Sequence, residues 1–192
     1  MRGFVPLQRF VVGTVLIATA PLSALSAAAI AVFDGPPVLF RQPRLGLHRK
    51  PFALHKLRTM KGGRVTPIGR VLRDRGWDEI PQLWSVWTGD MSLIGPRPLT
   101  GEDADRLALD HPKLNERYGV RPGLTGLIQV LGTRGAAFSI QVENGYARRR
   151  CATLDAQILV LSGCSLLLGK DRTRSVVAKF PRYKDWLLGM EG

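Results

Sequence analysis

The chain opens with a long apolar segment and continues as a mixed polar and apolar sequence. Residues 10–33 are 24 consecutive residues without a charge, whereas all 43 charged residues lie in the other 168. At about 1.5 Å per residue, a straight helix over this segment measures about 36 Å, enough to cross a bilayer core. The pattern predicts a membrane-associated segment over residues 1–36 and a polar domain over residues 37–192.

Three interpretations of the apolar segment compete. Arg2 and Arg9 followed by small residues at 26–29 resemble a signal peptide. Export is disfavoured, because residues 41–75 carry eleven Lys or Arg and one acidic residue. A straight span fits by length alone. A re-entrant helix, broken where Pro21 removes an N–H, keeps both basic flanks on the cytoplasmic face. The residues alone leave the straight span and the re-entrant helix open.

Hydrophobic spacing downstream predicts an α/β architecture that is mostly helical and lies against a membrane. The predicted elements are strands at 38–41 and 52–57 joined by a turn at 46–50, helices at 68–75, 78–87, 100–118 and 154–168, a loop at 121–126 and a strand at 127–131. Thr100 is expected to cap its helix, and Pro112 to interrupt it. Residues 174–188 mix aromatic and basic side chains, typical either of a helix at a membrane interface or of a peripheral helix packed on the domain.

Composition narrows the class of protein. The chain has 28 Lys and Arg against 15 Asp and Glu, a formal charge of +13, and 45% apolar residues. This content excludes a disordered tail, and Cys151 and Cys164 are too few for a disulfide scaffold. The charge alone suits nucleic acid, but the sequence shows no groove-reading motif or aromatic platform. We therefore expect anionic lipid headgroups, and no nucleic acid, as the partner of the basic flank.

The adjacent carboxylates Asp78 and Glu79 are the first candidates for chemistry. Such a pair most often caps a helix, and Pro81 fits only the first turn of that helix. A carboxylate at a helix N-terminus stays ionised and is available as a nucleophile or metal ligand. Neighbouring helical residues diverge by about 100°, so one carboxylate can attack while the other holds a cation.

Basic residues stand on both sides of this pair. Arg73 precedes it, and Arg97 follows in a loop fixed by Pro96 and Pro98, which presents the guanidinium with little entropy to lose. Arg121 opens a glycine-rich stretch at 121–126 that permits close approach of the backbone to a phosphate. Arginines around ionised carboxylates suit a phosphate-bearing substrate.

Five blocks, in order, resemble the bacterial sugar transferase family, the monotopic polyprenyl-phosphate phosphoglycosyl transferases. They cover residues 34–42, 51–60, 66–70, 78–98 and 120–130. The strongest motifs read Asp78-Glu79-Ile80-Pro81-Gln82, Gly95-Pro96-Arg97-Pro98 and Arg121-Pro122-Gly123-Leu124-Thr125-Gly126. The resemblance runs from the membrane segment to about residue 170.

The resemblance implies an activity and a location. Sugar 1-phosphate passes from a UDP-sugar to polyprenyl (undecaprenyl) phosphate with release of UMP, the first membrane step of polysaccharide or glycoconjugate assembly. The catalytic domain is then expected on the cytoplasmic face of a bacterial inner membrane. In this family the membrane segment is a re-entrant helix broken at a Ser-Pro pair, here Ala20-Pro21.

The resemblance also implies residue roles. Asp78 is the expected nucleophile, forming a covalent phosphosugar intermediate, and Glu79 and Asp155 are the expected ligands of Mg²⁺. Lys56, Arg73 and Arg97 also match functional positions of the family. One departure is the loop Gly132-Thr133-Arg134, where the arginine is displaced by one residue. The alternative to an enzyme is therefore a membrane-attached, catalytically degenerate relative that acts as a binding or scaffold protein.

Overall fold

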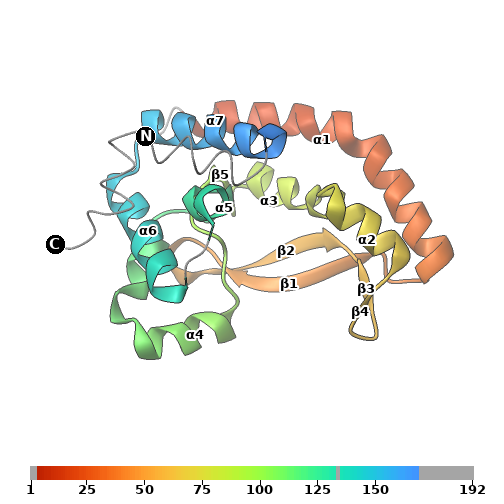
Figure 1. Cartoon of the computed structure of the whole chain (residues 1–192). Coiled ribbons are helices and arrows are strands. Elements are labelled where there is room, and N and C mark those ends of the chain that lie inside the picture. Colours follow the sequence, from red (N-terminus) through yellow and green to blue (C-terminus); the bar gives the residue numbers. More distant parts are fainter. Residues whose placement is uncertain (1–3, 133–134, 169–192) are drawn as a thin grey trace. The chain divides into compact units, whose positions relative to one another are not determined.

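The computed structural model describes residues 4–132 and 135–168 (Figure 1). This described part is mostly helical and carries three sheets of two strands each. The chain forms two compact units. The first contains the described residues up to Arg44 together with Pro51–Met91, and the second contains Leu45–Lys50 and the described residues from Ser92 onward. This division does not bear on the predicted membrane boundary at residue 36, which stays a prediction.

The apolar segment forms one long helix. Helix α1 (Phe4–Ala29) continues through Pro21 and passes into a π-helical turn, η1 (Ile30–Asp34). Figure 1 shows its ribbon bending along its length. Among the described residues, the stretch Gln8–Asp34 is the one helix long and apolar enough to cross a membrane, and most of it is exposed in the protein. This helix makes the chain a candidate for membrane association, whereas the break and re-entry at Pro21 remain predictions.

Basic side chains hold both ends of this helix within the first unit. Arg9 Nη2 donates to the carbonyl of Thr88 at 3.0 Å. At the other end, Arg58 donates to the carbonyl of Asp34 at 3.1 Å and to the carbonyls of the next two residues. Lys61 Nζ donates to the same Asp34 carbonyl at 2.8 Å. The last carbonyls of a helix have no partner inside it and carry partial negative charge, so cations stabilise them.

Two hairpins and three short helical segments complete the first unit. Strands β1 (Leu39–Leu45) and β2 (Pro51–Leu57) form the predicted hairpin, and the 3₁₀ turn η2 (Leu47–Arg49) that connects them is counted with the second unit. Strands β3 (Met60–Lys61) and β4 (Arg64–Val65) form a second hairpin that the sequence did not predict. Helix α2 (Pro67–Asp74), the 3₁₀ turn η3 (Trp77–Glu79) and helix α3 (Gln82–Thr88) follow. Ile30, Leu57 and Leu72 form one buried core cluster.

The prediction of a single helix at 78–87 is wrong about where the helix begins. Asp78 and Glu79 lie in the 3₁₀ turn η3, and α3 starts later, with Pro81 as its N-cap. Ile80 keeps helical backbone angles (φ −52°, ψ −41°), but Pro81 has no N–H to donate, so the hydrogen-bond ladder is interrupted there and α3 starts after Pro81. The carboxylate pair therefore precedes the helix by about one turn.

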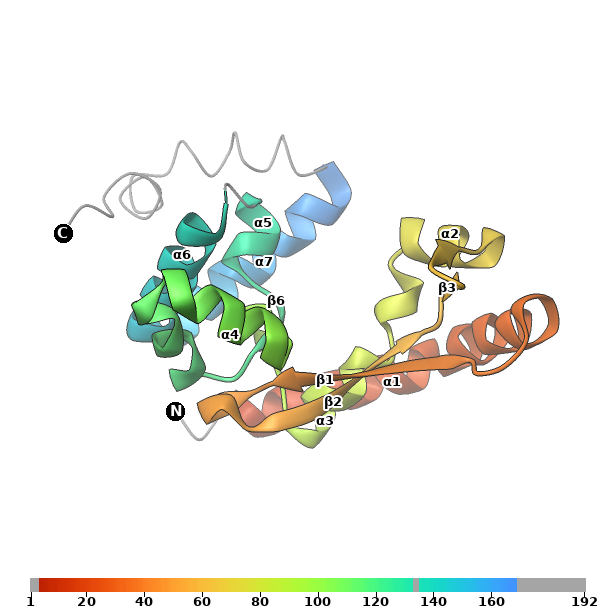
Figure 2. The same ribbon diagram turned by 90° about the horizontal axis from the view of Figure 1, so that it is seen from below.

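The second unit gathers four helices around a short parallel strand pair. Figure 2 shows α4 to α7 grouped with β6. The elements are β5 (Ser92–Ile94), α4 (Gly101–Asp110), η4 (Pro112–Gly119), β6 (Gly123–Thr125), α5 (Leu127–Leu131), α6 (Ala136–Arg149) and α7 (Ala152–Leu168). Thr100 Oγ1 caps α4, and the helix stops before Pro112, as predicted. The main core cluster contains Ile94, Leu127, Leu131, Val142, Tyr146 and Ile158.

The structure corrects two predictions in this unit. Residues 127–131 form helix α5, not a strand, and the buried residues Leu127, Val130 and Leu131 have helical spacing. A run of five residues, four of them apolar, is too short for periodicity to distinguish a helix from a strand. The stretch 121–126 is not only a loop, because Gly123–Thr125 pairs in parallel with Ser92–Ile94. Helix α6 was not predicted, and the predicted helix at 174–188 lies outside the described residues.

Candidate active site

Tight packing of α2 fixes the turn that carries Asp78. A Cβ on Gly69 would lie 2.2 Å from the carbonyl oxygen of Thr59, so only glycine permits this approach. Thr66 Oγ1 caps α2 by accepting from the Gly69 N–H at 2.9 Å. Gly76 then reverses the chain with a left-handed backbone (φ 69°, ψ 13°). The turn η3 follows at once, so the direction of Asp78 is set by α2.

The carboxylates of η3 differ in their surroundings. Asp78 is buried, with 8% of its surface exposed. The Glu79 side chain is 47% exposed and forms an ion pair with Lys56, whose Nζ lies 2.5 Å from Glu79 Oε1. Lys56 reaches it from β2, which contacts η3. One carboxylate is thus shielded from water, while the other lies at the surface beside a cation.

Burial raises the pKa of Asp78, and the negative charge of Glu79 raises it further. Lys56 acts in the opposite direction, as does Arg73, and both lower the pKa of Asp78. Arg73 is held in place because its Nε donates to the buried Thr59 Oγ1 at 2.7 Å. Lys56, Arg73, Asp78 and Glu79, separated by up to 23 positions in sequence, therefore form one electrostatic cluster in the first unit.

The carboxylate pair fits a magnesium ion that arrives with a phosphate substrate. Within residues 4–132 and 135–168, no group of three His, Cys, Asp or Glu side chains is placed to hold a metal. Mg²⁺ usually binds through one or two carboxylates together with water and substrate phosphates, so a full protein cage is not needed. Asp78 and Glu79 supply oxygen donors of this kind. In the structure, Glu79 is neutralised by Lys56.

Arg97 of the second unit lies in a closely supported loop. Its side chain is exposed, whereas Pro96 and Pro98 on either side are buried. A Cβ on Gly95 would lie 2.4 Å from the carbonyl oxygen of Arg121, at the start of the glycine-rich stretch. The structure thus brings the Arg97 loop next to the Arg121 backbone, a contact that the sequence motifs did not predict.

Asp155 is part of a buried polar network in the second unit. Its Oδ1 accepts from the Tyr146 hydroxyl at 2.5 Å, and its Oδ2 accepts from Arg150 Nε at 3.2 Å. Arg150 also reaches Ser92 Oγ at 3.2 Å. Burial, and next the hydrogen bond to Asp155, raise the pKa of Tyr146. A metal ion at Asp155 would share its oxygens with these donors, and the metal role stays a prediction.

Sequence reasoning missed Arg117 and Glu143, whose buried side chains contact the Arg97 backbone. Arg117 follows the interruption at Pro112, and Glu143 lies in α6, which no hydrophobic pattern marked. Glu143 stands between Val142 and the polar Asn144, so no local pattern identified it as buried. Thr133 and Arg134, the altered part of the loop, lie outside the described residues.

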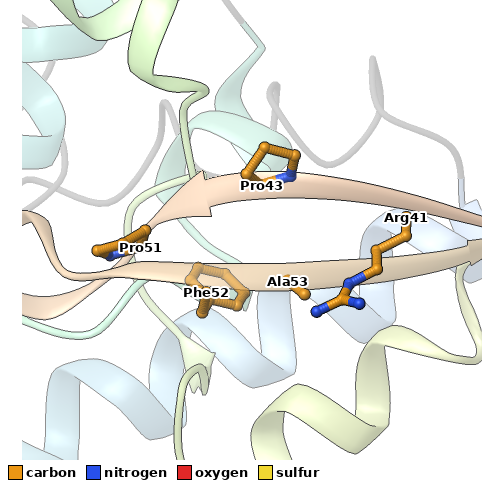
Figure 3. A pocket seen from close by; sticks show the side chains of 5 residues that line it. All are labelled: Arg41, Pro43, Pro51, Phe52 and Ala53. Carbon is orange, nitrogen blue, oxygen red and sulfur yellow. The ribbon is translucent and has the colours of Figure 1, made fainter.

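A separate open hollow of about 440 Å³ lies on the β1–β2 hairpin (Figure 3). Arg41, Pro43, Pro51, Phe52 and Ala53 line it. Figure 3 shows Arg41 and Phe52 pointing to the same side of the ribbon. None of the candidate residues lines this hollow, so the site is not built on it.

A comparison with protein families matches residues 6–169 to the bacterial sugar transferase family. The uncharacterized sugar transferase EpsL of Bacillus subtilis is 36% identical over 180 residues, covering 85% of this chain and 88% of the relative. The UDP-glucose:undecaprenyl-phosphate glucose-1-phosphate transferase of Caulobacter vibrioides is 44% identical over 137 residues, covering 64% of this chain and 51% of the relative.

A third relative is named for a different sugar. The UDP-N-acetylgalactosamine-undecaprenyl-phosphate N-acetylgalactosaminephosphotransferase of Aeromonas hydrophila is 37% identical over 125 residues, which cover 58% of this chain and 30% of the relative. The chain matches about half the length of the Caulobacter enzyme and less of the Aeromonas enzyme. The family match over residues 6–169 includes the candidate residues, while the named sugar differs between relatives.

Proposed function

Because this chain belongs to the bacterial sugar transferase family, we propose that it transfers a sugar 1-phosphate from a UDP-sugar to polyprenyl phosphate and releases UMP. The observation that carries the proposal is the environment of Asp78. A buried carboxylate lies beside an exposed one, with Lys56 and Arg73 acting electrostatically on it. Such a cluster suits a nucleophile that must meet a negatively charged phosphoryl group.

The proposed reaction is two successive displacements at one phosphorus. A carboxylate oxygen of Asp78 attacks the phosphorus attached to the sugar, and the bond from that phosphorus to the bridging oxygen breaks. UMP leaves with the electron pair, and Asp78 carries the phosphosugar. A phosphate oxygen of the polyprenyl acceptor then attacks the same phosphorus, and the Asp78 oxygen leaves. Splitting the transfer lets one nucleophile serve two very different substrates in turn.

The other charged residues have supporting roles in this proposal. Lys56 and Arg73 favour the ionised form of Asp78, the form that attacks. Glu79 would hold Mg²⁺, which when bound neutralises charge on the diphosphate and the leaving UMP. Arg97 and Arg121 of the second unit are proposed to bind substrate phosphate, a task suited to the planar, permanently charged guanidinium.

The location of the acceptor requires a membrane, and the first unit provides apolar surface for one. Phe10, Ile17 and Phe33 are at least 74% exposed along α1 and η1. Trp84 and Trp87, exposed on α3 with ring centroids 5.0 Å apart, add aromatic surface typical of a membrane interface. We propose that α1 enters and leaves on the cytoplasmic face of the inner membrane, with its basic flanks on anionic headgroups.

Enzyme turnover tests the proposal. Purified protein is assayed for UMP release from a panel of UDP-sugars with undecaprenyl phosphate and Mg²⁺. Asp78→Asn keeps the shape of the side chain and removes its charge, so turnover and the covalent phosphosugar adduct are both expected to disappear. Unaltered turnover in Asp78→Asn would overturn the nucleophile assignment. Absence of UMP release by the unaltered protein with every donor would favour the scaffold alternative.

Topology has its own test. In a background where Cys151 and Cys164 are replaced by Ser, Gly3→Cys provides one thiol near the start of α1. A membrane-impermeant maleimide is expected to label it only after the cells are lysed. Labelling in intact cells would indicate a straight span with its first residues outside the cytoplasm.

A further inference from the structure

The backbone around Arg97 is hydrogen-bonded at every step. The Gly95 N–H donates to the Thr125 carbonyl at 2.9 Å, and the Pro96 carbonyl accepts from the Gly123 N–H at 2.9 Å. The Arg97 N–H donates to Glu143 Oε1 at 2.9 Å. The loop therefore has little freedom, and the exposed guanidinium of Arg97 is the part that extends from it.

Arg97 is held by a buried ion pair. Its carbonyl accepts from Arg117 Nη2, and Arg117 Nη2 also lies 3.0 Å from Glu143 Oε2. One carboxylate thus binds the N–H of Arg97 and the guanidinium that binds its carbonyl. Arg117 and Glu143 are carried by η4 and α6, two elements in extensive contact. We refer to these two side chains as the Arg97 clamp.

Stability alone explains this arrangement poorly. The side chains of Arg117 and Glu143 are 4% and 7% exposed. Removing two charges from water is costly, and well-packed apolar residues often replace a buried ion pair with no loss of stability. Burial raises the pKa of Glu143, and the charge of Arg117 opposes this rise. Charge-assisted hydrogen bonds are short and strongly directional, so the pair is suited to fixing the position of a backbone.

The cavity beneath the Arg97 loop is too small for a substrate phosphate. A cavity of about 10 Å³ is lined by Pro96, Arg97, Pro98, Arg117 and their neighbours, which is room for about one water molecule. Any phosphate that Arg97 binds must therefore lie on the outer side, where its guanidinium is exposed. A small displacement of the loop would move that guanidinium directly.

The geometry points to Glu143 and Arg117 as positioning residues for substrate binding: by holding both the N–H and the carbonyl of Arg97, they fix its guanidinium for a phosphate of the substrate. This inference rests on the proposed function, which gives Arg97 its phosphate. It adds two residues that never touch the substrate and act only through Arg97. If the pair only stabilised the fold, removing it would have the same effect whichever residue stood at position 97.

A double-mutant cycle separates these cases. In otherwise unaltered protein, Glu143→Gln replaces one carboxylate oxygen, which accepts hydrogen bonds, with an NH₂ group, which donates them. It also leaves Arg117 without its counter-charge. Loss of a hydrogen bond to a charged group corresponds to a fall of about tenfold to a hundredfold in kcat/KM. In the Arg97→Ala background, the same substitution is expected to change kcat/KM by less than about twofold, because its only route of action is gone. An equal loss in both backgrounds would overturn the inference.

Matched variants guard against misfolding. Glu116 and Arg148 form another Arg–Glu pair of the second unit, 3.5 Å apart and exposed, so Glu116→Gln is expected to leave kcat/KM within about twofold. Glu143→Gln combined with Arg117→Met removes both buried charges together and avoids an uncompensated one. We expect this double variant to fold and still show the loss in kcat/KM. A folded double variant with normal kcat/KM would contradict the inference.

Amide hydrogen exchange tests the clamp without turnover. In Glu143→Ala, exchange at the Arg97 amide is expected to rise by about tenfold or more, since its acceptor is gone. The Gly95 amide, which donates to Thr125, serves as the internal reference and keeps its rate. Unchanged exchange at Arg97 refutes the clamp itself. Normal clamping in a protein that releases no UMP would instead refute the proposed function and leave the clamp a feature of the fold alone.

Discussion

Lys56 and Glu79 should shift the pH dependence of catalysis in opposite directions. Both act on Asp78, which must be ionised to attack, so kcat/KM falls as the pH drops through the pKa of Asp78. Lys56 lowers that pKa, and Glu79 raises it. Lys56→Met is therefore expected to move the acidic limb of the profile to higher pH, and Glu79→Gln to move it to lower pH.

Lys56→Met and Glu79→Gln are expected to lower the free energy of unfolding only slightly, so a shift of the pH profile will not reflect misfolding. Lys56 Nζ and Glu79 Oε1 lie 2.5 Å apart, but their side chains are 24% and 47% exposed. Solvent screening reduces such a pair to about 0.2–1 kcal/mol. For a chain of this length that is a fall of at most about 4 °C in the melting temperature. The variants should therefore remain folded under assay conditions.

The assay is kcat/KM for the UDP-sugar between about pH 4 and pH 9, measured by UMP release. The position of the acidic limb is compared, not the absolute rate, because Glu79→Gln also removes a proposed magnesium ligand. Lys113→Met removes an exposed lysine of the second unit and should leave the limb in place. Limbs that shift in the same direction, or do not move, would refute the assignment of the limb to Asp78.

Three further predictions concern stability, each read from a thermal melt or denaturant titration. Gly95→Ala places a Cβ 2.4 Å from the Arg121 carbonyl oxygen and should lower the free energy of unfolding by at least about 2 kcal/mol. As its control, Gly101→Ala adds a Cβ that meets nothing within 4 Å, so it should be neutral or stabilising. Thr66→Ala removes the cap of α2 and should cost about 1 kcal/mol. Asp155→Asn disrupts a buried pair with Arg150 and should cost about 3 kcal/mol; a rise in the Mg²⁺ concentration for half-maximal rate would show that Asp155 also binds metal.

Local sequence signals predicted several elements of this protein well. The uncharged run predicted α1, two short strand-like runs joined by a turn predicted the β1–β2 hairpin, and Thr100 and Pro112 set the limits of α4. These features depend on neighbours along the chain, through capping, proline geometry and burial of one helix face. The motif blocks likewise identified the family before any geometry was known, which the comparison confirmed.

Long-range contacts decided what the sequence could not. Gly123–Thr125 is a strand only because Ser92–Ile94 pairs with it, and glycine is otherwise unfavourable in strands. The direction of Asp78 depended on the packing of α2 against Thr59, where Gly69 leaves no room for a Cβ.

The sequence identified Asp78, Glu79 and Arg97 as candidate site residues, because paired carboxylates and a proline-flanked arginine are typical of phosphate chemistry. The burial that raises the pKa of Asp78 was not readable, nor was the buried pair that holds the Arg97 backbone. Desolvation and ion pairing are set by atoms that approach from 20 to 46 positions away in sequence. Sequence thus determined which groups are available, and only the tertiary structure determined their charge state and support, because both depend on what excludes water around them.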